Sequence, residues 1–150
     1  MEKIEISAFK ENENIPEEYS CDGKDISPEI KIVDASPEKY YMIIMNDPDA
    51  PVGLFTHWVI YNINSKSGVI SKSIENKKIT KEGFYQGKND FGKIGYGGSC
   101  PPKGDKPHRY FFNLYLQKSF INEDEISVKR AYEIASNLEK LSSYMGIYKR

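Results

Sequence analysis

The sequence lacks the features of membrane-spanning and nucleic-acid-binding proteins. None of its apolar runs approaches the length needed to cross a bilayer. Residues 1–16, MEKIEISAFKENENIP, show no charged-then-apolar leader pattern. The net charge is −1, so no positive excess attracts nucleic acid or anionic lipid. We therefore expect a cytoplasmic protein with no nucleic-acid partner and no stable membrane insertion.

Cysteine and histidine are equally scarce. Two cysteines, Cys21 and Cys100, are too few for a disulfide framework, and their spacing leaves open whether they lie close enough to bridge. The only histidines are His57 and His108. No pair among these four residues has the short spacing typical of zinc ligands. We therefore expect neither a metal nor another cofactor.

What the chain does have is enough apolar sequence for one core. It has 150 residues, of which 39% are hydrophobic and 29% charged, as in folded globular proteins. This length is usual for a single domain. No internal repeat, low-complexity linker or break in composition divides it. We expect one domain covering residues 1–150.

Strand patterns dominate the first two-thirds of the chain. Alternating or continuous apolar runs predict strands at 3–9, 40–46, 57–63 and 109–117. Between these runs, the long segment 77–106 is rich in glycine and lysine, and loops of that length are usually functional or disordered.

Only one segment has a clear helical pattern. Apolar residues recur at helical spacing within 122–143. Asn122 with Glu125 could form a capping box at its start, and Ser127 is an equally good N-cap. The pattern as a whole predicts a mainly β sandwich with a helix packed at one side.

The motif DPDAP at 47–51 ends a predicted buried strand. Asp47 and Asp49 project to the same side of an extended chain, where two carboxylates repel unless they share a proton or meet donors. A simple turn is the better interpretation of the motif alone. Its place after a buried strand, with His57 opening the next one, favours a site.

A second motif, GYGGSCPPKGDKPHRY, spans 95–110. Its glycines permit positive φ angles, and such a turn can aim N–H groups at an anion. His108 and Tyr110 share one face of the following strand. The motif lacks the GK[ST] ending of a P-loop. For Cys100 we prefer a structural role over a nucleophilic one, and Ser99 does not lie in a GxSxG elbow.

Taken in order, these segments resemble the phosphatidylethanolamine-binding protein family, which includes the Raf kinase inhibitor proteins. The similarity is greatest to its short prokaryotic branch. It rests on four segments distributed between residues 15 and 150: IPEEYSCDGKDISPEI, DPDAP followed by HW, GKNDFGKIGYGGSCPPKGDKPHRYFFNLY, and the closing GIYKR.

The resemblance implies a Greek-key β-sandwich with one or two peripheral helices and a pocket at one end that binds phosphate or phosphorylated head groups. Carried over by motif, the ligand-binding residues are Asp47, Asp49, Pro51, His57, Cys100, Pro101, Pro102, His108 and Tyr110. A cis bond between Ala50 and Pro51 is also expected. The implied role is binding and regulation rather than catalysis.

Two alternatives stay open: inhibition of a serine protease or kinase through surface loops, and a small hydrolase that uses the Asp/His cluster. A homodimer is open as well. We expect no counterpart of the long C-terminal helix that the family's eukaryotic members have. If both histidines attract the anion, affinity falls as the pH rises from about 6 to 8. We also expect that either histidine can be replaced by alanine without unfolding the sandwich.

Overall fold

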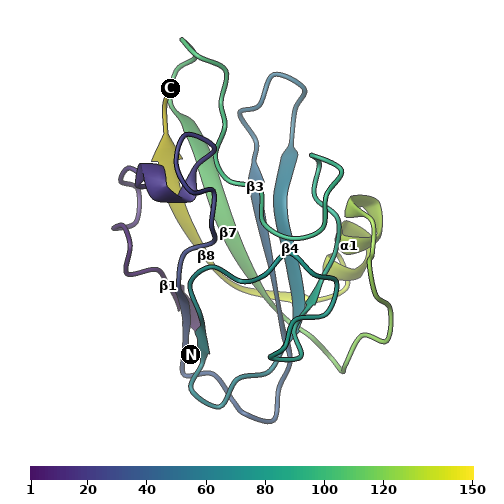
Figure 1. Cartoon of the computed structure of the whole chain (residues 1–150). Coiled ribbons are helices and arrows are strands. Elements are labelled where there is room, and N and C mark those ends of the chain that lie inside the picture. Colours follow the sequence, from purple (N-terminus) through teal and green to yellow (C-terminus); the bar gives the residue numbers. More distant parts are fainter.

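Two antiparallel sheets and one α-helix make up the computed structural model, which describes residues 1–150 (Figure 1). The strands are β1 (Lys3–Glu5), β2 (Ile30–Val33), β3 (Tyr41–Asp47), β4 (Phe55–Ile63), β5 (Val69–Ile70), β6 (Tyr85–Gln86), β7 (His108–Leu116) and β8 (Glu139–Tyr148). The helix α1 spans Val128–Ala135, and a short 3-10 helix, η1, spans Glu17–Tyr19. The mainly β sandwich with a peripheral helix is confirmed.

The larger sheet has the strand order β6-β4-β3-β7-β8, and the smaller has the order β1-β2-β5. The predicted strands 40–46, 57–63 and 109–117 correspond to β3, β4 and β7, the three central strands of the larger sheet. The predicted strand 3–9 is shorter than expected and is limited to β1. No helix of the structure combines the length and the apolar character that crossing a bilayer requires.

Strand β3 is buried on both faces, which explains its continuous apolar run. Ile43 and Met45 belong to the core between the two sheets, whereas Met42 and Ile44 face a second, smaller core. That smaller core contains Ala131 of α1. The helix therefore covers the outer face of the larger sheet, as Figure 1 shows.

The predicted helix is too long at its C-terminal end. It ends at Ala135, and the residues from Glu139 onward form the ten-residue strand β8. β8 pairs with β7 along its whole length, so tertiary pairing outweighs the local helical pattern. At the other end the cap is Ser127, whose side chain accepts a hydrogen bond from the Arg130 N–H at 3.1 Å.

The topology brings the ends of three central strands together at one end of the larger sheet. β3 is antiparallel to both β4 and β7, so the last residue of β3 lies beside the first residues of its two neighbours. The loop that follows β3 and the segment that precedes β7 meet at this end of the sheet, at the top of the view in Figure 1. The two sequence motifs are thereby brought together.

Candidate functional site

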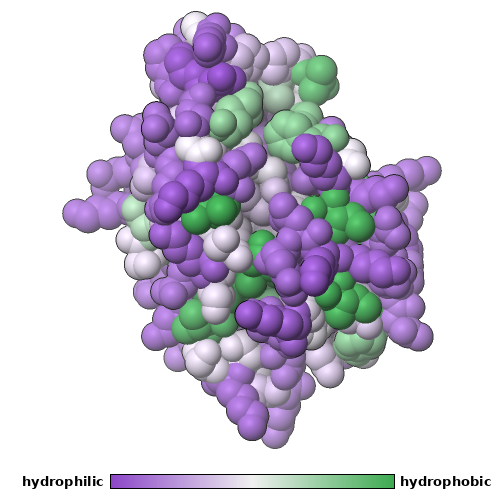
Figure 2. Space-filling view, viewed as in Figure 1, coloured by the Kyte–Doolittle hydropathy of each residue, from purple (hydrophilic) through white to green (hydrophobic).

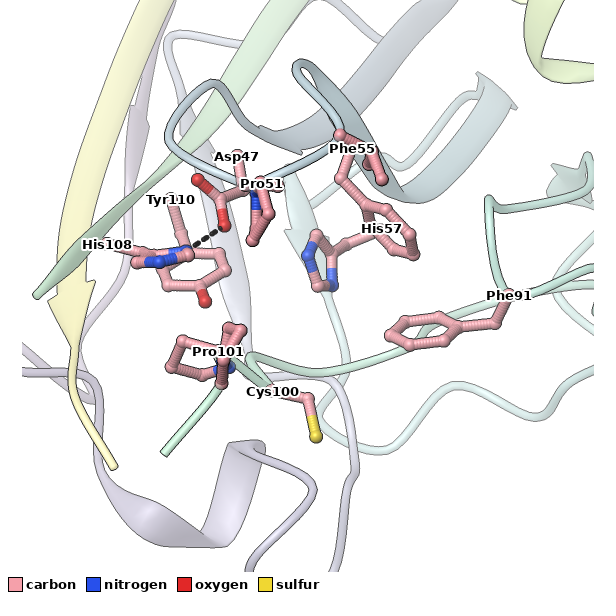
Figure 3. Close-up of a pocket in the computed structure, with 12 residues that line it drawn as sticks. Asp47, Pro51, Phe55, His57, Phe91, Cys100, Pro101, His108 and Tyr110 are labelled. Carbon is pink, nitrogen blue, oxygen red and sulfur yellow. Dashed lines mark hydrogen bonds and ion pairs between the residues drawn. The ribbon is translucent and has the colours of Figure 1, made fainter. Parts of the chain in front are cut away.

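A cavity of about 240 Å³ lies at the end of the larger sheet where β3 ends and β4 and β7 begin. Its lining residues come from the end of β3, the loop after it, the start of β4, the glycine-rich segment and the start of β7 (Figure 3). They are Asp47, Ala50, Pro51, Val52, Phe55, His57, Phe91, Cys100, Pro101, Pro102, His108 and Tyr110. All nine predicted ligand-binding residues except Asp49 are among them.

Asp49 instead fastens the loop after β3 to β7. Its carboxylate accepts hydrogen bonds from the backbone N–H, Nε and Nη2 of Arg109 at 2.9, 2.9 and 2.8 Å. These bonds from Arg109 lower the pKa of Asp49 to about 2, against a smaller opposing effect of burial. Asp49 therefore positions the loop rather than lining the cavity.

The expected cis bond between Ala50 and Pro51 is wrong, because the chain has no cis peptide. The turn is built differently. The Asp47 carboxylate accepts the Asp49 N–H at 2.7 Å, and the Gly53 N–H donates to the Ala50 carbonyl at 2.9 Å. Pro51 thus takes the second position of a four-residue turn, where a trans proline is favoured.

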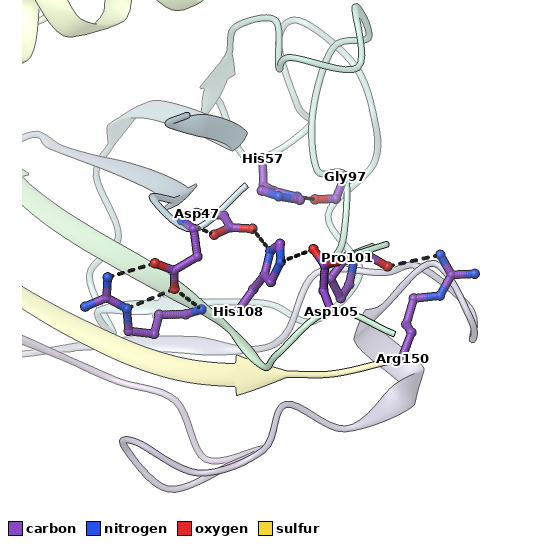
Figure 4. A network of polar contacts seen from close by, with 9 residues as sticks. Asp47, His57, Gly97, Pro101, Asp105, His108 and Arg150 are labelled. Atoms are coloured by element: carbon purple, nitrogen blue, oxygen red, sulfur yellow. Dashed lines mark hydrogen bonds and ion pairs between the residues drawn. The ribbon is translucent and has the colours of Figure 1, made fainter. Parts of the chain in front are cut away.

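His108 is held by a carboxylate on each ring nitrogen. Its Nδ1 lies 2.7 Å from Oδ2 of Asp47, and its Nε2 lies 3.0 Å from Oδ2 of Asp105 (Figure 4). Burial alone would lower the pKa of His108, but the hydrogen bonds and charges of the two carboxylates outweigh it and raise that pKa. Two acceptors at once favour the imidazolium, which has two N–H groups.

His57 has the opposite surroundings. Its Nδ1 lies 2.7 Å from the Gly97 carbonyl, which only accepts, so Nδ1 carries the hydrogen (Figure 4). Burial lowers the pKa of His57. The ring is therefore a neutral imidazole whose Nε2 is an acceptor. Two histidines on one cavity thus differ in charge.

Tyr110 brings a hydroxyl that has no protein partner. The side chain is fully buried, and its oxygen makes no hydrogen bond. Figure 3 shows this hydroxyl directed into the cavity between His108 and Pro101. Burial raises the pKa of Tyr110, with the negative charge of Asp47 adding to the effect, so the hydroxyl keeps its proton and is free to donate.

Cys100 is joined to Cys21 by a disulfide, across 79 residues of sequence. The bridge answers the question that the sequence left open, and it excludes a Cys100 thiolate nucleophile while the bond is intact. Arg150 lies against the same sulfur, with Nη1 3.3 Å from Sγ of Cys100. Ser99 is no better as a nucleophile, because its buried hydroxyl has no hydrogen-bond partner that could activate it.

The remaining wall of the cavity is apolar and was not predicted. Phe55 and Phe91 pack edge to face at 4.8 Å, and the Phe55 ring lies 4.9 Å from the His57 ring. Val52 is 84% exposed and Phe91 is 44% exposed, so both form the rim. In Figure 2, a small group of hydrophobic residues lies at the upper right of the view, next to hydrophilic residues at the upper left. Phe55 could have been predicted as a lining residue from its position two residues before His57.

Asp105 was also missed, although its place three residues before His108 was a signal. It does not line the cavity, and its carboxylate contacts the second ring nitrogen of the lining residue His108. No group of three or more His, Cys, Asp or Glu side chains is arranged to hold a metal ion. The polar chemistry of the site therefore consists of hydrogen-bond donors, one acceptor imidazole and buried charges.

Comparison with known proteins gives one consistent family. The family described as phosphatidylethanolamine-binding protein matches residues 5–146. A UPF0098 protein of Aquifex aeolicus is 43% identical over 148 residues, covering 95% of this chain and 85% of that protein. The structure of Escherichia coli YbcL, described as a new member of the mammalian PEBP family, is similar with a TM-score of 0.86 at 28% identity, covering 99% and 98% of the two chains.

A more distant likeness is to carboxypeptidase Y inhibitor, solved in complex with its cognate proteinase. The TM-score is 0.58 at 18% identity, covering 99% of this chain and 83% of the other. At this identity the likeness is one of fold alone.

Proposed function

The chain belongs to the phosphatidylethanolamine-binding protein family, and from this premise we propose that its pocket binds a small organic anion. The anion has a phosphate-like head joined to an apolar group. In this proposal the ligand is bound and released unchanged, and the bound state serves a regulatory or inhibitory role.

The Tyr110 hydroxyl is the observation that carries the proposal. Leaving a buried donor without a partner costs about 1–3 kcal/mol, so natural proteins seldom keep one without a use. This hydroxyl is on the wall of a cavity and next to the imidazolium of His108. A neutral donor beside a cation suits the oxygen of an anion.

His57 adds selectivity for a partly protonated head. Its Nε2 is an acceptor, so it suits an O–H of a phosphate monoanion or an N–H of a head group. A fully deprotonated anion would place its oxygen against this lone pair. The proposed ligand therefore carries at least one acidic or amine proton when bound.

The apolar rim supports the second half of the proposal. Val52, Phe55 and Phe91 offer apolar surface at the mouth of the cavity, above the polar groups. Covering apolar surface contributes about 25 cal/mol per Å², whereas a bare inorganic ion covers none of it. An apolar substituent on the anion should therefore increase affinity.

Calorimetric titration with matched compounds tests both parts of the proposal, the charged head and the apolar group of the ligand. Phenylphosphonate should bind roughly tenfold more tightly than methylphosphonate, and benzyl alcohol, which lacks the charged head, should bind much more weakly than either. The Tyr110→Phe variant should lose affinity for both phosphonates by about tenfold or more, since a hydrogen bond to a charged group contributes about 1.5–3 kcal/mol. Equal binding by wild type and Tyr110→Phe would contradict the proposal.

Inhibition of a serine protease is the second candidate, favoured by the fold shared with carboxypeptidase Y inhibitor. It predicts a stoichiometric complex with a protease and loss of that protease's activity, which titration of carboxypeptidase Y measures directly. No observation on this chain favours a kinase as partner. Cys100 and Ser99 are disfavoured as nucleophiles of a hydrolase, because neither meets an activating base. In the Asp/His cluster, Asp47 and Asp105 occupy both ring nitrogens of His108.

The disulfide bears on where the protein works. Disulfides are uncommon in the reducing cytosol of mesophiles and common in oxidising compartments and in hyperthermophiles. A cytoplasmic location therefore requires a cytosol that preserves this bond. Mass spectrometry of protein alkylated during cell lysis measures its redox state, and complete reduction would contradict a structural role for the bond.

A further inference from the structure

Asp105 lies on the loop that leads from the glycine-rich segment into β7. The loop turns at Gly104, whose φ is +90°, and the Asp105 N–H donates to the Pro102 carbonyl at 3.2 Å. The backbone carbonyl of Asp105 also accepts a hydrogen bond from Nζ of Lys149 at 2.8 Å. The start of the same loop lines the cavity, so the Asp105 side chain is beside the site without being part of its wall.

The two carboxylates on His108 are not equivalent. Asp47 has a side chain that is 3% exposed, and its other oxygen is engaged by the Asp49 N–H. The Asp105 side chain is 39% exposed, and the 3.0 Å bond to His108 is its only side-chain hydrogen bond. Moving Asp47 would bury an unpaired charge, whereas Asp105 can turn into water at small cost.

An imidazolium has one N–H on each nitrogen, and the protein occupies both in His108. An anion in the cavity can therefore bond to His108 only where one carboxylate gives way. While Asp105 stays in place, the anion would also be repelled by the carboxylates of Asp47 and Asp105, and only the single positive charge of His108 would attract it. Both effects oppose the anion that the pocket is proposed to bind.

We propose that Asp105 is an internal competitor that holds Nε2–H of His108 until an incoming anion displaces it. This inference rests on the proposed function, because it concerns the same anion. It makes Asp105 a specificity-determining residue: only a ligand whose head is a better acceptor for His108 than a carboxylate can take its place. Neutral ligands and weak acceptors would leave the contact intact.

Asp105→Asn tests the competition, because the side chain keeps its shape and loses its charge. Inorganic phosphate should bind the variant roughly threefold to tenfold more tightly than wild type at pH 6, as expected for removing one partly exposed ion pair and one repelling charge. The gain should shrink by pH 8, since His108 without Asp105 loses its proton at lower pH. The titratable and charged groups around His108 are Asp47, Asp49 with Arg109, Asp105, Tyr110, the β8 neighbour Tyr148 and, across the cavity, His57, and only Asp105 changes.

Asp124→Asn is the matched control. Asp124 is 50% exposed, pairs with Lys78 at 3.6 Å in the segment before α1, and does not touch the pocket. Its replacement changes the net charge equally and should leave phosphate affinity unchanged. Thermal midpoints of both variants verify folding. Unchanged or weaker phosphate binding by Asp105→Asn, with wild type binding normally, overturns the competition alone. Absence of binding of both inorganic phosphate and phenylphosphonate by both proteins overturns the proposed function and the competition with it.

Discussion

At the scale of single residues, the site separates two histidines that look alike in the sequence. Both are about equally buried, yet one meets two carboxylates and the other meets a carbonyl. Acceptors that carry charge favour the imidazolium of His108, whereas burial outweighs the neutral carbonyl acceptor at His57 and favours the neutral ring. We therefore expect only His108, and not both histidines, to attract the anion by its charge.

NMR titration of the two rings should show this separation. The pKa of His108 is raised and that of His57 is lowered relative to 6.5, so at pH 6.5 we expect His108 mostly charged and His57 mostly neutral. Anion affinity should fall as the pH rises through the raised pKa of His108. The imidazole Cε1–Hε1 signals report each ring, assigned with a His57→Gln variant. Two coincident titration curves would contradict the assignment.

The same shifts have opposite effects on stability. A raised pKa in the folded state means that His108 stabilises fully below about pH 6.5, and this contribution is lost as the pH rises through the folded pKa. A lowered pKa means that the neutral His57 costs nothing above about pH 6.5, and stability falls as the pH drops from there toward the folded pKa.

Removing His108 should also destabilise the protein, which qualifies the expectation that it could be replaced without unfolding the sandwich. His108→Gln leaves the buried Asp47 carboxylate without its charged partner, and breaking a buried pair costs about 3–5 kcal/mol. Urea unfolding measures the loss. Replacing Asp47 by Asn in the same chain should restore part of it, because no buried charge then remains. A double variant as unstable as the sum of both single ones would contradict the coupling.

At the scale of elements, the pocket wall depends on connections between distant segments. The disulfide ties the turn after η1 to the glycine-rich segment, and Arg150 at the end of the chain contacts both Asp22 and Cys100. Residues 97–107 of the wall form no helix or strand, only an isolated bridge and a turn. Their position is therefore set by these links.

Loss of the disulfide should destabilise the protein measurably. A closed loop of 79 residues corresponds to roughly 4 kcal/mol in the chain-entropy description of disulfides. The Cys21→Ser, Cys100→Ser double variant, or wild type under dithiothreitol, should lose about that much free energy of unfolding. Phosphonate affinity should fall as well, because Cys100 is part of the wall. Equal stability of the oxidised and reduced protein would contradict this prediction.

At the scale of the whole molecule, the two cores share strand β3, so we propose that residues 1–150 unfold as one unit. Odd-numbered residues of β3 face the core between the sheets, and even-numbered ones face α1. Neither core can be disrupted without changing a strand that the other requires. A cooperative transition follows from such sharing.

Ile43→Ala tests this sharing. Ile43 is fully buried, and truncation of such a residue costs about 2–5 kcal/mol. Fluorescence of Trp58, in the core between the sheets, and far-ultraviolet circular dichroism should give one coincident transition shifted by that amount. Ile79→Ala, at a side chain that is 41% exposed, is the control and should shift it far less. Separate transitions for the two probes would show independent units.

The sequence by itself determined the central strands, the existence of the helix and most of the pocket. β3, β4 and β7 could be predicted because an apolar run or alternation is a local property of neighbouring residues. Ordered motifs indicated the family, and the family indicated which residues share a cavity. Ser127 and Asn122 could not be ranked as caps, because both have suitable side chains and only the folded backbone places one at the helix start.

Only the tertiary structure decided what each group in the pocket does. The helical pattern after Ala135 became β8 because β7 offered a partner strand. The tautomer of His57 depends on Gly97 and the charge of His108 depends on Asp47, which are 40 and 61 residues away in sequence. The disulfide spans 79 residues, and Asp49 pairs with Arg109 across 60. Charge, redox state and orientation depend on neighbours in space, and residues so far apart become neighbours only when the sheet brings their strand ends together.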